Sequence, residues 1–417
     1  QVNSFLKPYN QIMSILKHTG RYYSFILMLA AAGIFASCSD DHRSETTAGR
    51  QAISFNVASV ENSTTRSLIE SGAKPESGTD HSLQTACTPT EGGRSIGVWA
   101  DYSLPQTDGS ELVFSNIFKN TSIAYQKRND DNGNPVNDWN YSGDPLFWQI
   151  GGIYKFRAFY PQEEMREYIT TASSATSFQI DYSTYQLQED LLVAYNRVNT
   201  ATLDILHQPT GGTFDLHTPV PLGFKHALAA IMLQFKYKEN HADNDVLTSC
   251  WLENTNAEES ERFATTGVLV YGNSTTEEAI DWQPTFWEPI GEKIYYWQPQ
   301  SGKAFTDKLS ATAYTGQATE GNLYTKNDGY LLVIPQEYKG GLRLCFTTEQ
   351  GGSTVFKVLL PEATGTDKDG NAVTTPPYYF AAGKRYIYTI ALTKTNLDVS
   401  LSIADWNVRK TSDEIIF

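Results

Sequence analysis

The chain has 417 residues, of which 19% are charged and 12% aromatic, and its formal net charge is −15 at pH 7. An acidic protein repels nucleic acid and anionic lipid, so this charge argues against both as electrostatic partners. The length suggests two domains, and the many aromatic and β-branched residues, without a sustained 3.6-residue period, predict a β-rich fold.

A short apolar run near the N-terminus, residues 25–37, ends at Cys38. Basic residues precede the run and small residues end it, which is the pattern of a secretory signal peptide. A cysteine at this point predicts a lipoprotein signal. Residues 1–37 are then removed, and acyl chains such as palmitate modify the Cys38 thiol. An ordinary signal with a chance cysteine is the alternative. Because Met13 is a more natural start, we expect residues 1–12 to be a mis-assigned extension.

The first part of the expected mature chain contains one strand between two polar segments. Residues 38–50 are polar after the cysteine and are expected to form a disordered tether. Residues 53–60 alternate apolar with small or polar side chains, which predicts a half-buried strand. The polar loop that follows contains Arg66 and Ser67.

Beyond this loop, short alternating segments separated by turn residues recur along the chain and are typical of β-sandwiches. A polar break at residues 238–245 gives our preferred domains, 51–240 and 241–406, followed by a C-terminal tail at 407–417. A proline pair at 219–221 is the alternative boundary. The segments expected to form strands are 95–100, 153–160, 178–182, 190–195, 231–237, 266–271, 293–297, 330–336, 341–346, 354–360, 383–392 and 397–406.

Motifs for catalysis or metal binding are absent from the sequence. It contains no G-x-S-x-G, no H-E-x-x-H and no P-loop, so we predict a non-enzymatic protein without cofactor or metal. Cys87, Cys250 and Cys345 lack C-x-x-C spacing, and they are either buried thiols or one disulfide with one thiol left over. Eight tryptophans leave a second hypothesis open, a monomeric surface lipoprotein that binds glycans through exposed aromatic rings.

The order and spacing of several short motifs resemble the fimbrillin family of Bacteroidetes, the Mfa-like and FimA-like subunits of type V pili. After the lipoprotein signal and first strand come TTRS (64–67), SIGVWA (95–100), LFWQIGGIYKFRAFYP (146–161), DLLVAY (190–195), VPLGFKHALAAI (220–231), YLLVIPQ (330–336), AGKRYIYTIAL (382–392) and SIADW (402–406). The resemblance covers nearly the whole expected mature chain.

The resemblance implies an all-β fold of two consecutive transthyretin-like, Greek-key β-sandwich domains. It also implies a subunit of a cell-surface fimbria that serves adhesion, carried to the outer membrane by its lipid. An arginine-specific protease cuts between Arg66 and Ser67, the segment 51–66 leaves, and a C-terminal strand of a neighbouring subunit takes its place, which gives a head-to-tail polymer. The candidate donor residues are Leu397, Val399, Leu401, Ile403, Ile415, Ile416 and Phe417.

Three alternatives stay open at this stage. Arg66 is either the maturation site or an ordinary solvated arginine. Residues 397–406 are either the donor or the last strand of their own domain, with only residues 407–417 free to donate. The chain is either a stalk or a tip subunit, and its adhesion ligand on a host or bacterial surface is not specified by the sequence.

Overall fold

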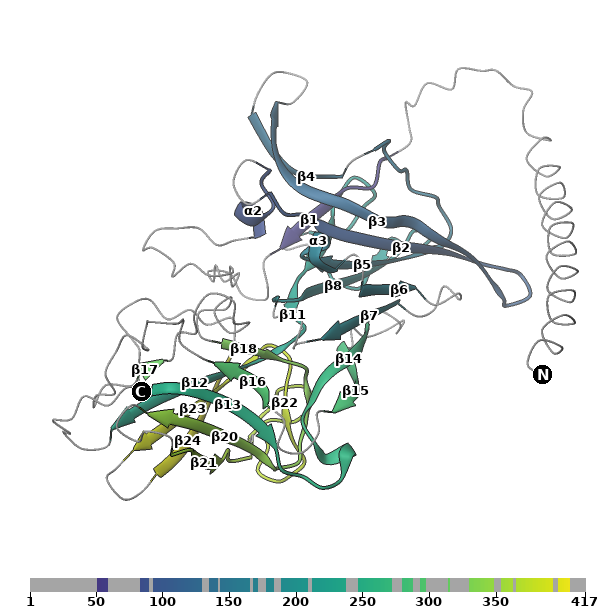
Figure 1. The fold of residues 1–417 in the computed structure, drawn as a ribbon. Helices are drawn as coiled ribbons and strands as arrows, with labels where there is room; N and C mark the ends of the chain where they lie inside the picture. The colour runs from purple at the N-terminus through teal and green to yellow at the C-terminus, as the bar shows by residue number, and fades with distance from the viewer. Residues whose placement is uncertain are drawn as a thin grey trace, which may run out of the picture. The chain divides into compact units, whose positions relative to one another are not determined.

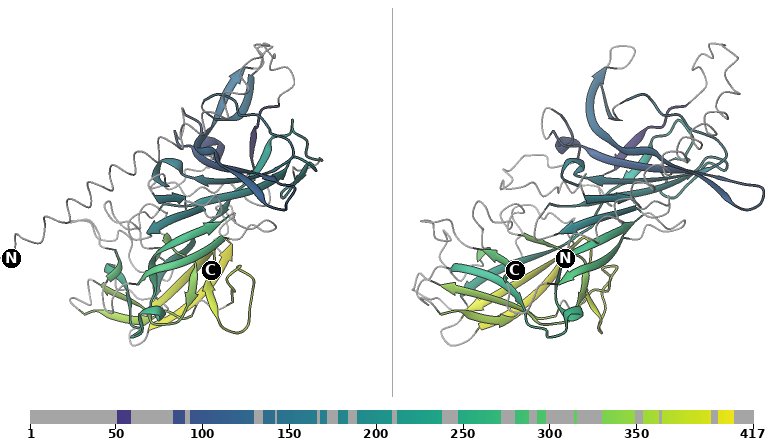
Figure 2. Two further views of the ribbon diagram at one scale, coloured as in Figure 1. Left: turned by 90° about the vertical axis from the view of Figure 1, so that its right-hand side faces the viewer. Right: turned by 45° about the vertical axis from the view of Figure 1, so that its right-hand side comes forward.

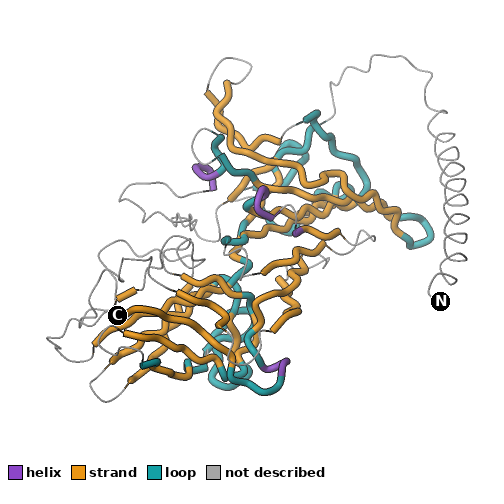
Figure 3. The backbone as a smooth tube through the Cα atoms, viewed as in Figure 1, coloured by secondary structure: helices purple, strands orange, loops and turns teal. Residues whose placement is uncertain are grey.

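Almost all the regular structure is β, and only short helical turns interrupt it (Figure 3). The computed structural model describes residues 51–58, 83–89, 93–129, 135–141, 143–165, 168–171, 178–183, 189–208, 212–237, 247–271, 280–287, 293–297, 314–315, 330–348, 354–362, 365–392 and 397–405. These residues all belong to one compact unit, residues 51–417. The expected all-β fold is confirmed.

The first half of the chain builds a nine-stranded sheet, in the order β10-β1-β4-β3-β2-β5-β8-β11, with β9 paired to β8 (Figure 1). Two short helices, α2 and α3, accompany it. The bounds are β1 Phe55–Ala58, α2 Leu83–Ala86, β2 Ile96–Pro105, β3 Glu111–Asn129, β4 Pro135–Tyr141, β5 Ile153–Tyr160, α3 Gln162–Met165, β8 Leu192–Asn199, β9 Asp204–Ile205, β10 Val220–Gly223 and β11 Lys225–His226.

One face of this sheet covers an aromatic-rich core, which we call the first core. On the central strands every second residue points into it, for example Tyr154, Phe156 and Ala158 on β5. This follows from the period of two in a strand. The sheet curls around the core, so that β8 and β10 come close together although they lie near opposite ends of the strand order. The contact between them is a hydrogen bond of 2.7 Å, which Asn196 Nδ2 on β8 donates to the carbonyl of Pro221 on β10.

Strand β3 is long because two irregularities let it follow β2. Its pairing moves from Tyr102↔Phe114 to Ala100↔Phe118 and then to Val98↔Thr121, so β3 contributes extra residues at each step. Asn116 and Asn120 adopt φ values of 59° and 49°, a conformation that asparagine tolerates better than most residues. Such bulges bend a strand and reset which side chains face the core.

The second half of the chain forms further sheets that surround a second core. The five-stranded sheet has the order β17-β12-β23-β24, with β18 beside β12, and a four-stranded sheet has the order β16-β13-β20-β21. Both contribute to this second core, as Leu233, Leu252, Leu344 and Tyr388 show. The bounds are β12 Ala229–Tyr237, β13 Leu247–Asn254, η3 Glu259–Glu261, β16 Lys293–Trp297, β17 Tyr314–Thr315, β18 Tyr330–Val333, β20 Leu342–Thr348, β21 Phe356–Leu359, β23 Lys384–Leu392 and β24 Leu397–Asp405.

A third core joins strands from both halves of the chain. The sheet β15-β14-β7-β6 pairs Leu269 with Ile180, which lie far apart in the sequence. These residues pack with Phe159 and Val193 from the outer face of the first sheet and with Leu332 from β18. The bounds are β6 Ile169–Thr171, β7 Phe178–Ser183, β14 Ala264–Tyr271 and β15 Ile280–Trp287. Strands β19 Gln336–Tyr338 and β22 Tyr378–Phe380 form a separate two-stranded sheet, which contributes Tyr338 and Phe380 to the second core.

The pairing of β12 bears on the expected domain boundary. We expect residues 229–237 in the first domain, yet this strand pairs with β17, β18 and β23 of the second half (Figure 1). By sheet membership the change therefore falls between His226 and Ala229, earlier than the polar break at 238–245. The extents of the two expected domains remain a prediction.

The three cysteines Cys87, Cys250 and Cys345 are free and buried. Burial raises the pKa of each thiol, and the pKa of Cys345 rises to about 12, so none is a ready nucleophile. The residues that the structure describes include no helix that is long and apolar enough to cross a membrane.

Candidate functional site: the position of strand β1

Strand β1 occupies an internal position of the first sheet. It pairs in parallel with β10, from Phe55↔Val220 to Ala58↔Gly223, and antiparallel with β4 through Phe55↔Trp139. A bridge between Ala52 and Phe147 precedes these pairs. Removal of β1 would therefore separate β10 from β4 and leave both with unpaired backbone groups.

The side chains of β1 fill the first core at every second position. Ile53, Phe55 and Val57 are 1%, 3% and 7% exposed. The ring of Phe55 contacts Phe118 and Phe156 edge-to-face, with centroids 5.3 and 5.5 Å away. Phe55 and Val57 on β1, with Ile53 just before it, make this segment a plug for an apolar groove, which we call the β1 slot.

Backbone hydrogen bonds hold the N-terminal end of β1 against the segment before β5. The Ile53 N–H donates to the carbonyl of Leu146 at 2.7 Å, and the Trp148 N–H donates to the carbonyl of Gln51 at 3.0 Å. The Tyr141 hydroxyl donates to the carbonyl of Ile53 at 3.2 Å. Burial raises the pKa of Tyr141, so this phenol stays protonated and remains a donor.

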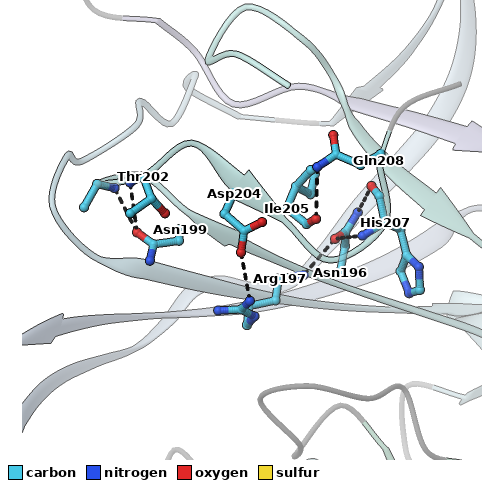
Figure 4. A network of polar contacts seen from close by, with 9 residues as sticks. Asn196, Arg197, Asn199, Thr202, Asp204, Ile205, His207 and Gln208 are labelled. Atoms are coloured by element: carbon cyan, nitrogen blue, oxygen red, sulfur yellow. Dashed lines mark hydrogen bonds and ion pairs between the residues drawn. The ribbon is translucent and has the colours of Figure 1, made fainter. Parts of the chain in front are cut away.

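Strand β10, which forms one wall of the slot, is held by a polar network around Asn196 on the neighbouring strand β8 (Figure 4). Asn196 is fully buried. Besides its bond to Pro221, its Oδ1 accepts the His207 N–H at 3.3 Å. On the exposed side of the network, Arg197 pairs with Asp204 at 3.1 Å. Because these contacts do not involve β1, the wall keeps its supports when β1 is absent.

Replacement of Asn196 with leucine is expected to lower the free energy of unfolding by about 2 kcal/mol, because buried backbone groups at Pro221 and His207 lose their partner. Chemical denaturation of the uncut protein measures this. The matched control is Asp204→Ala, which removes a surface ion pair worth less than about 1 kcal/mol. Equal effects of the two variants would contradict the role given to Asn196.

Strand β24, which contains donor candidates, lies at the end of the five-stranded sheet. It pairs antiparallel with β23 from Lys384↔Asp405 to Leu392↔Leu397. Val399, Leu401 and Ile403 are partly buried and pack against the second core. In this form of the protein, residues 397–405 are thus the last strand of their own sheet. Strand β24 would have to break its pairing with β23 before it could be donated.

The remaining predicted site residues lie outside the described residues. These are Cys38, Arg66, Ser67, Ile415, Ile416 and Phe417. Their roles therefore stay predictions. Within the described part of the chain, no group of three His, Cys, Asp or Glu residues is placed to hold a metal ion.

The glycan hypothesis gains no support from the tryptophans. Wherever the structure describes a tryptophan side chain, it is buried or half-buried, as for Trp99, Trp139, Trp148, Trp251 and Trp282.

Sequence reasoning missed the walls of the slot, β10 and the segment 146–148. Residues 219–222 read PVPL. Proline is tolerated at the start of a strand, so the apolar residues beside these prolines could have predicted β10.

Several solved structures are similar to this chain at less than 20% identity. A search of curated proteins found no match. Among solved structures, a fimbrial protein from Bacteroides vulgatus is 14% identical, with 75% of this chain and 92% of that chain covered and a TM-score of 0.46. A candidate cell adhesion protein from Bacteroides uniformis is 17% identical, covering 86% and 99%, with a TM-score of 0.43. The C-terminally truncated tip fimbrial protein Mfa3 of Porphyromonas gingivalis is 12% identical, covering 75% and 94%, with a TM-score of 0.31.

A family description gives the stronger result. Residues 84–406 match the family described as fimbrillin-like. This match spans more than three quarters of the 417 residues and includes every described strand except β1. The chain belongs to the fimbrillin-like family.

Proposed function

We propose that this protein is a non-enzymatic structural subunit of a cell-surface fimbria that assembles by protease-triggered strand exchange and serves adhesion. The observation that carries the proposal is the internal position of β1, with Ile53, Phe55 and Val57 buried in the first core. An internal strand close to the N-terminus leaves a complete apolar groove when it departs. A strand from another subunit restores both the backbone pairing and the core.

The precursor is proposed to reach the outer membrane as a lipoprotein acylated at Cys38. An arginine-specific protease then cuts between Arg66 and Ser67, in the polar sequence that follows β1. The cut separates residues 51–66 from the rest of the chain, so that only non-covalent contacts retain β1. Membrane attachment by lipid then ends, and the subunit enters the fimbria.

The spacing of apolar residues favours β24 over the tail as the donor. Val399, Leu401 and Ile403 repeat the period of Ile53, Phe55 and Val57, three apolar side chains at alternate positions. The tail 407–417 reads NVRKTSDEIIF and offers no such triplet. A donated β24 therefore supplies one apolar side chain for each one that β1 removes. Each is worth roughly 1.5–3 kcal/mol when buried.

A disulfide lock tests whether β1 must leave. Asn56 and Pro221 are paired neighbours on β1 and β10, so we expect Asn56→Cys with Pro221→Cys to form a disulfide after oxidation. The oxidised double variant, cut at Arg66, should form no polymer, and reduction should restore polymerisation. Each single variant is the control and should polymerise in both conditions. Polymer formation by the locked protein would overturn strand exchange at the β1 slot.

Arg66→Ala is expected to abolish maturation. The wild-type subunit recovered from cells should begin at Ser67, whereas the variant should begin at acylated Cys38, as mass spectrometry of the N-terminal peptide can show. The variant should also remain monomeric. Arg66→Lys is the matched control, because it keeps the charge yet removes the side chain that an arginine-specific protease requires. A Ser67 terminus in either variant would show that the cut does not depend on arginine at position 66, and a wild-type terminus other than Ser67 would place the cut elsewhere.

A further inference from the structure

An apolar strip lies uncovered on the hairpin formed by β2 and β3. The last pair between β2 and β5 is Ser103↔Ile153, while the hairpin continues to Pro105↔Glu111 (Figure 2). Large apolar side chains on and beside this extension are exposed, Leu112 by 49%, Phe114 by 42% and Ile150 by 62%. We define the apolar strip as Leu104, Leu112, Phe114 and Ile150.

The strip continues the face of the first sheet that covers the first core. Leu104 pairs with Leu112 and Tyr102 pairs with Phe114, so these side chains share one face. Tyr102 belongs to the first core, and its hydroxyl donates to the carbonyl of Ile150 at 3.2 Å. The core face of the sheet therefore extends into solvent here, and exposed apolar surface of this kind marks an interaction site.

A row of aromatic rings connects the strip with the N-terminal end of β1. The Trp148 N–H binds the carbonyl of Gln51, and the Trp148 ring packs on Tyr154 with centroids 5.0 Å apart. Tyr154 packs on Tyr102 at 4.6 Å, and Tyr102 on Phe114 at 6.0 Å. An unbroken row of aromatic rings thus leads from the open end of the β1 slot to the apolar strip.

The chain's own upstream residues are poorly suited to cover the strip. Residues 39–50 read SDDHRSETTAGR, in which Ala48 and Gly49 are the only uncharged residues without a polar side-chain group. A protein surface that contributes apolar side chains is the better match. The position of the strip, at one end of the β1 slot, identifies the direction from which such a surface comes.

The direction of the donor strand determines where the rest of the donor lies. The slot presents the Leu146 carbonyl and the N–H groups of Trp148 and Val220, which bind backbone groups of residues 51–54. A donor that runs in the same direction as β1 uses these groups in the same register. Val399, Leu401 and Ile403 then replace Ile53, Phe55 and Val57, and Leu397 replaces Gln51.

The connection within the donor is short. The donor's β23 ends at Leu392, and only residues 393–396 separate it from Leu397. Five residue steps span no more than about 18 Å even when fully extended. The folded remainder of the donor, which we call the donor body, must then lie within this distance of the place held by Gln51, from which the rings of Trp148, Tyr154 and Tyr102 lead to the apolar strip.

We propose that the apolar strip is the contact surface for the donor body of a second copy of this chain. The inference rests on the proposed strand exchange and adds a second interface to it. The donated strand fills the β1 slot, and the strip packs against the donor body. This second contact fixes the angle between successive subunits and speeds capture of the donor strand.

Two measurements on the mature chain cut at Arg66 separate this contact from the strand slot. The first is polymerisation of the full chain, and the second is uptake of a synthetic peptide of residues 396–406, which has no donor body. The test variant is Leu112→Ser with Phe114→Ser. The control is Val113→Ser, because Val113 lies between them, is 39% exposed and faces the other side of the hairpin.

We expect the test variant to take up the peptide at the wild-type rate and to polymerise at least tenfold more slowly, while Val113→Ser behaves as wild type in both. Polymerisation of the test variant at the control rate would overturn the inference, as would normal polymerisation with lost adhesion, which would assign the strip to another ligand. Loss of peptide uptake would also overturn it, because the strip would then belong to the slot. Failure of the wild-type protein in both measurements would instead reject strand exchange itself.

Discussion

Replacement of Phe55 with alanine is expected to destabilise the precursor and to leave the assembled fimbria unaffected. In the precursor the ring is 3% exposed and contacts Phe118, Phe156 and Tyr141 edge-to-face. Truncation of such a ring leaves a cavity and should lower the free energy of unfolding by about 3–5 kcal/mol. Chemical denaturation of the uncut chain measures this loss.

The assembled form provides the contrasting measurement. If β1 has left, Phe55 is no longer present, and polymers of the variant should dissociate at the wild-type temperature. Asn56→Ala is the matched control, since Asn56 lies next to Phe55 and is exposed. It should change neither form. Equal destabilisation of precursor and polymer by Phe55→Ala would mean that β1 stays in place after assembly.

The second large effect is expected from Asp101→Ala, which removes the anchor of the β2–β3 hairpin. Arg157 on β5 is 2% exposed, and its Nη1 lies 2.8 Å from Asp101 Oδ2. The other oxygen, Oδ1, accepts the N–H of Asn116 at the β3 bulge, at 2.9 Å. Loss of the carboxylate leaves a buried guanidinium with less compensating charge. We expect a loss of about 2–4 kcal/mol in the free energy of unfolding.

Thermal unfolding of Asp101→Ala beside Asp108→Ala checks this expectation. Asp108 lies in the turn of the same hairpin, and its carboxylate accepts hydrogen bonds from the N–H and the hydroxyl of Ser110 on the exposed surface. Its removal should leave the melting temperature close to that of the wild type. A small effect of Asp101→Ala would show that other contacts hold Arg157 and the bulge.

The sequence predicted strands well where alternation is regular. Residues 153–160 and 383–392 are examples, and the structure places β5 and β23 there. In each of these strands, all side chains on one face have similar surroundings along the strand, so the alternation is uninterrupted. Strand β3 was not predicted, although it is the longest strand described. The bulges at Asn116 and Asn120 shift the alternation twice, so no single period runs through its sequence.

Partners of strands are harder to predict than strands. The alternation of residues 53–60 indicated a buried face, but not that β10 and β4 lie on either side of β1. Likewise, residues 231–237 gave no sign that they join strands of the second half, since pairing depends on contacts that are remote in the chain. The donor candidates on β24 were found by their alternation, and this pattern fits a strand in its own sheet equally well.

The parallel pairing of β1 with β10 has a consequence for the time at which the precursor can fold. Phe55 pairs with Val220, and Ala230 pairs with Arg385, so both halves of the protein depend on contacts between residues more than a hundred positions apart. A chain exported from its N-terminus cannot close either sheet until the later partner has emerged. Folds with such high contact order form slowly. Until then, unpaired strand edges are exposed to aggregation. On the proposed export route, the stage most exposed to aggregation is the interval between emergence of β1 and closure of its sheet.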